Sequence, residues 1–450
     1  QTISPSGRRC RSDSRLDRRP WLPVLERRLS GINLASVTGN NLQRLDGAVN
    51  VVGCPSRLLI HGGEQPYMHQ HVRSILEYLQ HRDDVEFAYV RPVKDQPINH
   101  PNPRIERLAD ITWKYLRRAP NLFQPSEYIW TWRAAGMSGI DQSPPSEWRF
   151  RCSPLRGYLP WKPDMVLNAY PMAGNMLHRF VPWAGRKRIP IVSIDHGAPL
   201  QSYHWGGYRG SMWGCKANAC WGEWSRAINI GYGAPADQQV VTGSPTLDDI
   251  CGLSDDSTFL SECGLDPSRR KILLMTTHTE PLKGDMDVMM RRLFETYEED
   301  ERVQLIVKPH PVELRKGTLI DIPDHVHVIP DQPNLHKLMH AADCIISPAT
   351  SVIIPALAMN KPFVNLLQPD RDLYGDVDLS ALNDQLGEAV IHPDRVDAAI
   401  LGEIEMDQTT TGQVFEVLGH SADGRNGQRV LDLCAHILEH GGPQGWVFST

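Results

Sequence analysis

Apolar residues along this chain gather into short runs that alternate with segments of helical spacing. The first run, Leu58–Ile60, precedes a glycine turn and a segment in which Val72, Ile75, Leu76 and Leu79 recur at helical spacing. The run VEFAYV follows, so strand, helix and strand succeed one another. Such a unit requires a parallel sheet, because the helix carries the chain back to the start of the next strand.

The same alternation resumes after residue 163 and continues through a second series of apolar runs. The runs that predict strands are DMVLNAY, IPIVSIDHG, QQVVTGSP, KILLMTT, VQLIVKP, HVHVIP, CIISP and FVNLL. Helices are predicted around 105–116, 174–180, 286–298, 334–342 and 427–439. The pattern therefore predicts an α/β protein with two doubly wound domains joined near 244–256. We divide the chain into a basic N-terminal segment at 1–54, domains at 55–245 and 246–426, and a C-terminal helix and tail at 427–450.

The composition fits this picture and excludes some functions. A length of 450 residues suits two domains, and the net charge of −6 provides no basic field for nucleic acid. No apolar run reaches the ~18 residues of a membrane helix, and no apolar segment of a secretory signal follows the N-terminal arginines. The nine cysteines lack zinc-site spacing, which predicts reduced thiols, no metal and a cytoplasmic location.

The N-terminal segment differs from the rest, because residues 8–28 hold eight arginines against three acids. Two interpretations stay open. The segment is either a disordered tail or a basic arm that attaches the protein peripherally to an anionic surface, such as the inner face of the membrane.

Polar or glycine-rich loops follow five of the predicted strands. In open parallel sheets, ligands bind beyond the carboxyl ends of the strands, so we expect these loops to line one site between the domains. The glycines Gly62, Gly63 and Gly197 would let a backbone approach a ligand closely, although the turn at 62–63 does not match GxGxxG. The loops are His61–Gly63, Asp195–Gly197, Thr276 with Thr277 and His278, Lys308–His310, and Ser347–Ser351.

Two of these loops have the chemistry of an anion site. Ser347, Thr350 and Ser351 precede a helix predicted to begin near Val352, where free backbone N–H groups and hydroxyls bind anions. The alternative is that the hydroxyls only cap the helix.

The second such loop is KPHP, in which prolines restrict the backbone on both sides of His310. Lys308 and His310 together suit a phosphate or pyrophosphate, and the alternative is a solvated turn. His196 follows a predicted strand of the first domain, where a neutral imidazole could take a proton from an acceptor hydroxyl. For this residue the alternative is a histidine that binds backbone in a turn.

The order of short motifs resembles that of a known family. SILEYL, IPIVSIDHGAPL, VVTGSPTLDDI, VKPHP, SPATSVIIPALAMNKPFVNL and DGRNGQRVLDL occur in the order found in CDP-glycerol glycerophosphotransferases, which polymerise teichoic acids, and in related capsule-polysaccharide transferases. The resemblance covers about residues 56–440. It implies the GT-B fold, in which two Rossmann-like domains face one another across a cleft, the first on the acceptor side and the second for the nucleotide donor.

The resemblance also implies roles for single residues. His196 would be the catalytic base, and His310, Thr350 and Ser351 would hold the donor's phosphates. From their place in the strand-end loops, we expect Lys308, Ser347, Thr277 and His278 beside them. The donor would be a CDP-, CMP- or UDP-linked group, with no further cofactor. One departure is Pro355, which stands where the family pattern has an acid.

The sequence thus predicts a transferase that moves a nucleotide-activated polyol phosphate or sugar to a glycan, polyol-phosphate or lipid-linked acceptor. Two alternatives stay open. One is a nucleotide-sugar 2-epimerase, although the His-Glu-Ala-Gly type of turn in those enzymes is replaced here by residues 196–199. The other is a catalytically degenerate GT-B scaffold, suggested by Pro355.

Overall fold

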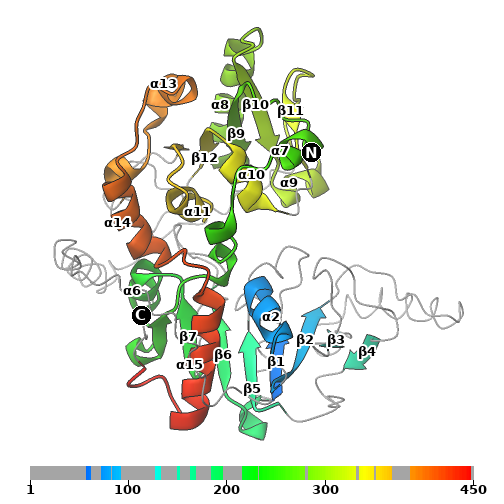
Figure 1. Ribbon diagram of the computed structural model, residues 1–450, viewed down its shortest axis with the longest axis vertical. Helices are drawn as coiled ribbons and strands as arrows, with labels where there is room; N and C mark the ends of the chain where they lie inside the picture. Colours follow the sequence, from blue (N-terminus) through cyan, green and yellow to red (C-terminus); the bar gives the residue numbers. More distant parts are fainter. Residues whose placement is uncertain are drawn as a thin grey trace, which may run out of the picture.

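Two sheets form the two lobes of the computed structural model of this chain, one above the other in Figure 1. The structure describes residues 57–61, 72–82, 84–92, 127–132, 149–152, 163–168, 184–195, 215–231, 233–278, 282–330, 334–348, 351–366 and 386–446. The N-terminal segment 1–54 and the helices expected around 105–116 and 174–180 lie outside these residues.

The first lobe holds a sheet in the order β4-β3-β2-β1-β5-β6-β7-β8. Six of its strands are parallel, and they include every strand predicted before residue 245. Their bounds are β1 Arg57–His61, β2 Glu86–Pro92, β5 Met165–Asn168, β6 Ile191–Ile194, β7 Ala217–Cys220 and β8 Gln239–Val241. Helix α2 (Arg73–Gln80) joins β1 to β2 as predicted. The antiparallel edge strands β3 (Glu127–Trp132) and β4 (Arg149–Cys152) were not predicted, and neither was β7.

The second lobe holds a parallel sheet in the order β11-β10-β9-β12-β13. All five strands were predicted from their apolar runs. Their bounds are β9 Arg270–Met275, β10 Val303–Lys308, β11 His327–Val328, β12 Cys344–Ser347 and β13 Phe363–Asn365. The helices of this lobe are α7 Ser257–Glu262, α8 Leu282–Thr296, α9 Pro311–Lys316, α10 Leu335–Ala341, α11 Ile353–Ala358 and α13 Val396–Leu401. Helix α9, which begins at the last proline of KPHP, was not predicted.

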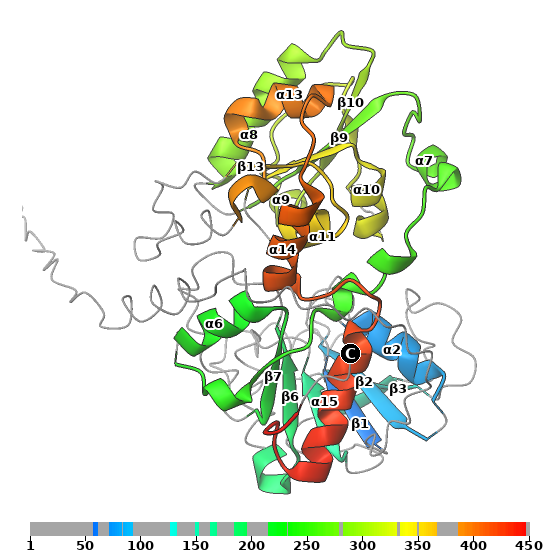
Figure 2. The ribbon, with the colours of Figure 1, turned by 60° about the vertical axis from the view of Figure 1, so that its left-hand side comes forward.

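The chain crosses between the lobes a second time near its C-terminal end. Helix α14 (Gln408–Gly419) buries Val414 and Leu418 in one apolar cluster with Trp224, at the start of α6 (Glu223–Gly231), and Trp221, just before it. The predicted last helix is α15 (Asn426–His440), and its apolar side chains join the core of the first lobe. Figures 1 and 2 show α15 beside α2 and α14 between the lobes. The first domain is therefore completed by the end of the chain.

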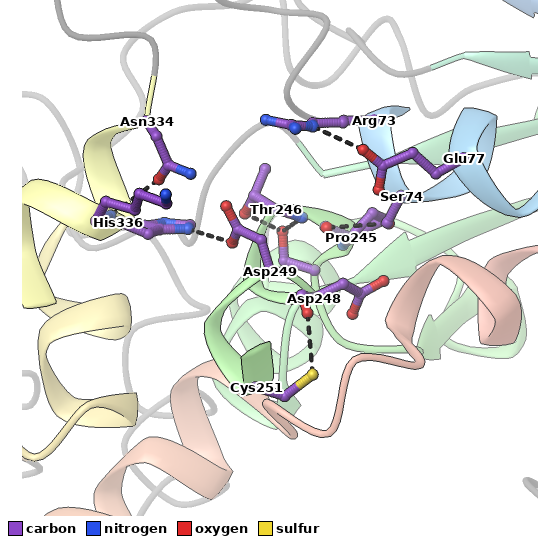
Figure 3. Close-up of polar contacts among 12 residues, drawn as sticks. Arg73, Ser74, Glu77, Pro245, Thr246, Asp248, Asp249, Cys251, Asn334 and His336 are labelled. Carbon is purple, nitrogen blue, oxygen red and sulfur yellow. Dashed lines mark hydrogen bonds and ion pairs between the residues drawn. The ribbon is translucent and has the colours of Figure 1, made fainter. Parts of the chain in front are cut away.

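The first crossing between the lobes includes a short junction segment, residues 243–249, which contacts the second crossing (Figure 3). The Asp248 carboxylate accepts hydrogen bonds from the backbone N–H groups of Asn426 at 2.8 Å and Gly427 at 2.7 Å, and burial raises the pKa of this carboxyl. The Ser74 hydroxyl, in the first turn of α2, donates to the Pro245 carbonyl at 3.1 Å. A Cβ at residue 427 would lie 2.6 Å from the Ser74 hydroxyl oxygen, so a larger residue there would displace this side chain. Two motifs of the predicted series, GSP and DGRNG, thus build this contact.

The junction also binds the second lobe. Asp249 pairs with His336 in the first turn of α10. In a βαβ unit the N-terminus of a helix follows the carboxyl end of the preceding strand. Since α2 follows β1 and α10 follows β11, both first turns lie at carboxyl edges. The carboxyl edges of both sheets therefore face the junction.

Candidate functional site

Three strand ends of the second sheet meet as predicted. Residue 276 directly follows β9 and residue 309 directly follows β10, and the two strands pair in parallel. The backbone N–H of His310 donates to the Thr276 hydroxyl at 2.8 Å. The Ser347 hydroxyl, at the end of β12, donates to the Met275 carbonyl at 3.2 Å. The carboxyl edge of this sheet therefore brings TTH, KPHP and Ser347 together.

His310 caps helix α9, and this cap determines which ring nitrogen carries a proton. Its Nδ1 accepts a hydrogen bond from the backbone N–H of Val312 at 3.2 Å, and Pro311 occupies the first helical position. A backbone N–H can only donate, so Nδ1 holds a lone pair and the neutral ring is protonated at Nε2. His310 thus presents an N–H donor, and its ring cannot accept a proton at Nδ1 without losing the cap.

Two imidazoles lie together at this edge. The rings of His278 and His310 have centroids 4.4 Å apart and an interplanar angle of 33°. His278 is exposed, whereas Thr277 before it is buried. The sequence predicted both histidines for one site, and the structure brings them into contact.

A buried carboxylate lies behind His310. The Glu313 side chain is 0% exposed, and one of its oxygens contacts the Thr276 hydroxyl and accepts from the His310 N–H at 3.3 Å. Lys283 lies 3.7 Å from the other oxygen, which has no hydrogen-bond partner among the described residues. Burial raises the pKa of Glu313, while the bonds to Thr276 and His310 oppose this shift.

Sequence reasoning missed Glu313 as a site residue, and it placed Thr276 in a loop of the site without giving it a role. The spacing that could have found Glu313 is His-x-x-Glu, which corresponds to the capping box usually begun by serine or threonine.

The remaining predicted residues are placed differently. The Lys308 ammonium donates to the carbonyls of Pro330 at 3.0 Å and Pro309 at 3.4 Å. Ser347 is 1% exposed, and its hydroxyl is bound to carbonyls of the sheet edge. Ser351 is half-buried, and α11 begins after Val352 without a side-chain cap. Thr350, His196, Gly62, Gly63 and Gly197 lie outside the described residues.

A second His-Pro cap provides an internal comparison. His392 precedes Pro393, and its Nδ1 accepts from the Asp394 N–H at 3.3 Å, so the local cap is the same. Its side chain is 56% exposed. It follows Ile391, which pairs with β13 and so lies four strand spacings from β10, or about 19 Å. A His-Pro cap alone therefore does not identify a binding site. His310 differs from His392 because it lies beside His278 at the sheet edge and because the buried Glu313 carboxylate accepts from its backbone N–H.

A buried polar cluster ends β6 in the first lobe. Asp195 is 2% exposed and accepts hydrogen bonds from the side-chain amides of Asn218 at 2.8 Å and Asn229 at 3.4 Å. Its backbone carbonyl accepts from the Trp221 indole N–H at 2.8 Å. Burial raises the pKa of the Asp195 carboxyl to about 6. This cluster fixes the residue that directly precedes His196 in the chain.

The described residues contain neither a candidate metal centre nor a membrane-spanning helix. Within them, no three His, Cys, Asp or Glu side chains are grouped so that they could hold a metal ion. Nor does any helix in this part of the chain combine the length and the apolar character needed to cross a bilayer.

Comparison with solved structures shows the class of the fold. The complex of MnaA from S. aureus with UDP is 14% identical, with a TM-score of 0.53 over 85% of this chain and 97% of that chain. A putative UDP-N-acetylglucosamine 2-epimerase from Listeria monocytogenes is 11% identical, with a TM-score of 0.53 over 88% and 99%. A variant of the wall teichoic acid polymerase TagF is 11% identical, with a TM-score of 0.52 over 86% and 89%. The chain has the two-domain GT-B fold that was predicted.

The comparison with protein families is more specific. Residues 223–433 match the family model described as CDP-Glycerol:Poly(glycerophosphate) glycerophosphotransferase, which confirms the predicted resemblance. The matched segment includes the second sheet, KPHP and the junction motifs. The chain is an enzyme of the GT-B glycosyltransferase or glycerophosphotransferase class. No curated protein sequence matches it.

Proposed function

We propose that this protein transfers a nucleotide-activated group, a polyol phosphate or a sugar, to an acceptor hydroxyl in the synthesis of a cell-surface polymer. The donor's diphosphate binds at the carboxyl edge of the second sheet, beside His310 and His278. The observation that carries the proposal is the cap on His310, because it places the ring proton on Nε2, at the edge where α/β sheets bind ligands. The family match, which covers the same edge, supports a donor of the CDP-linked kind.

His310 acts on the leaving group in this mechanism. A hydrogen bond from Nε2–H to a phosphate oxygen stabilises the negative charge that develops there as the nucleotide departs. His310 is unsuited to be the base, since its only lone pair already accepts from the Val312 N–H. The acceptor's proton must therefore go to another group.

His196 is the proposed base. Its imidazole takes the proton of the acceptor hydroxyl while the oxygen attacks the donor. In a glycerophosphotransferase the new bond forms to phosphorus, the bond from phosphorus to the bridging oxygen of CMP breaks, and CMP leaves with the bonding electrons. In a glycosyltransferase the attack is at the anomeric carbon, and the nucleoside diphosphate leaves. The fixed backbone of Asp195, one residue earlier, supports a defined exit of the chain from β6.

A product assay tests the proposal. The full chain is incubated with CDP-glycerol or with a UDP-sugar, with and without polyol-phosphate and glycan acceptors, and the released nucleotide is measured by chromatography. We expect CMP or UDP to be released only when an acceptor is present. A C2 epimer formed from the UDP-sugar alone would instead identify an epimerase. Binding of CDP or UDP without turnover on any acceptor would favour a scaffold.

A thermal-shift screen with CDP, CMP, UDP and GDP identifies the nucleotide. A compound that binds only the native state raises the melting temperature, by an amount that grows with its concentration relative to Kd. We expect a cytidine or uridine diphosphate to raise it most, and the full chain should be used because α15 completes the first lobe.

A further inference from the structure

The hydroxyl of Thr276 joins the two strand ends that carry the histidines. Thr276 directly follows β9 and lies two residues before His278. Its hydroxyl accepts a hydrogen bond at 2.8 Å from the backbone N–H of His310, which lies just after β10. Because the hydroxyl oxygen accepts this bond, its own hydrogen points to the Glu313 carboxylate that it contacts. The resulting chain of bonds runs from His310 through Thr276 to Glu313.

Glu313, in the first turn of α9, binds the same backbone N–H of His310. Its oxygen accepts from the His310 N–H at 3.3 Å, so this N–H is shared between the Thr276 hydroxyl and the carboxylate. The carboxylate is fully buried and Lys283 lies 3.7 Å away. A charged group at such a site has a large desolvation cost, which ordinary helix capping does not require. The comparison cap at His392 has no such support, since Arg395 stands at the position that corresponds to Glu313 and the nearby Asp394 is exposed.

We infer that Thr276 and Glu313 are positioning residues, which fix the backbone of His310 and thereby the spacing of the His278 and His310 rings that receive the donor's diphosphate. They do not touch the donor, and their effect on binding passes through His310. This inference rests on the proposed function, because it assumes that the two imidazoles bind the diphosphate.

A double-mutant cycle on nucleotide binding tests the inference. His310→Asn is the reference variant, because asparagine can still cap α9 but lacks the distal N–H of the imidazole. Thr276→Val removes the bridging hydroxyl at nearly constant volume, and Thr276→Ser restores it. Kd for CDP, and for UDP in parallel, is measured by calorimetry on the full chain. Double-mutant cycles of this kind isolate the coupling between two residues.

We expect Thr276→Val to raise Kd about tenfold, because this factor corresponds to the free energy of about one hydrogen bond. Thr276→Ser should have a Kd within about threefold of wild type. In the His310→Asn background, Thr276→Val should change Kd by less than about twofold, because the imidazole through which Thr276 affects the ligand is already absent. If Thr276 had a purely structural role, Thr276→Val would lower the melting temperature equally in both backgrounds, and its effect on Kd would also be the same in both.

Thr242→Val is the matched control. Thr242 is a buried threonine just after β8, and its hydroxyl donates to the Gly243 carbonyl at 3.0 Å. This variant should lower the melting temperature and leave Kd unchanged. If Thr276→Val does not fold, the pair Glu313→Gln and Glu313→Ala replaces it. Glutamine keeps an oxygen acceptor and should bind within about threefold, whereas alanine should weaken binding about tenfold.

The outcomes separate the two proposals. If Thr276→Val weakens binding equally in both backgrounds, or leaves it unchanged while His310→Asn weakens it, the positioning role is wrong and the diphosphate site stands. If His310→Asn itself binds CDP and UDP as wild type does, the proposed site is wrong, and the inference falls with it.

Discussion

Asp195 makes the folding stability of the first lobe depend on pH. Burial raises the pKa of its carboxyl to about 6, from an ordinary value of 3.8. Since the folded state holds this proton more tightly than the unfolded state, the stability that it contributes is fully present below about pH 3.8 and is lost as the pH rises through about 6. A difference of about two pKa units corresponds to about 3 kcal/mol.

The perturbation that tests this coupling is Asp195→Asn, which cannot ionise. Its side-chain oxygen can still accept from Asn218, whose own side-chain oxygen has no hydrogen-bond partner among the described residues and can receive the new amide. About half of the 3 kcal/mol falls between pH 5 and pH 7.5. We therefore expect the stability of the variant relative to wild type to increase by about 1.4 kcal/mol over this interval.

Urea unfolding at several pH values, followed by tryptophan fluorescence, measures this change. Trp221 is a suitable reporter, because its indole N–H donates to the Asp195 carbonyl. Glu262→Gln, at an exposed position in α7, is the matched control and should leave the pH dependence unchanged. If Asp195→Asn shows the same pH dependence as wild type, the carboxyl does not titrate as this account requires.

Two further predictions concern the junction and the base. Asp248→Ala leaves the buried N–H groups of Asn426 and Gly427 without an acceptor, so it should lower the free energy of unfolding by about 2–4 kcal/mol. Calorimetry measures this loss, and a value below about 1 kcal/mol would contradict the role of the junction. His196→Ala should lower kcat by roughly 10²–10⁴ and leave the Kd for CDP nearly unchanged, and an active variant would exclude it as the base.

Apolar runs were enough to predict most strands of this fold. The runs at β9, β10 and β12 are nearly continuous in apolar residues, as expected for strands buried on both faces. Strand β7 was missed because its sequence, ANAC, contains a buried Asn218, whose side-chain N–H donates to Asp195 just after the neighbouring strand β6. Such a pairing is a tertiary contact that no local pattern contains.

Helices were harder to predict where prolines or distant contacts decide them. The prolines of KPHP indicated a turn, although Pro311 is well suited to the first position of α9. The helical spacing of 427–439 predicted α15, but not that its apolar face completes the first lobe.

The candidate site was predicted in outline only. His278 and His310 come together because parallel strands bring their carboxyl ends to one edge, which is a general rule. Lys308 and Ser347 lie at the same edge, but their side chains bind backbone carbonyls of neighbouring segments. Which polar group at a sheet edge faces a ligand depends on these contacts, and the sequence does not contain them.

The central claim is that His310 binds the donor's diphosphate through Nε2–H. Its most direct test is a calorimetric titration of CDP and of UDP into wild type, His310→Asn and His392→Asn. Because a hydrogen bond to a charged group contributes about 1.5–3 kcal/mol, the account predicts a Kd about 10- to 100-fold higher for His310→Asn. It predicts an unchanged Kd for His392→Asn, which alters the same local cap at an exposed position. Equal affinities of wild type and His310→Asn for both nucleotides would contradict the claim.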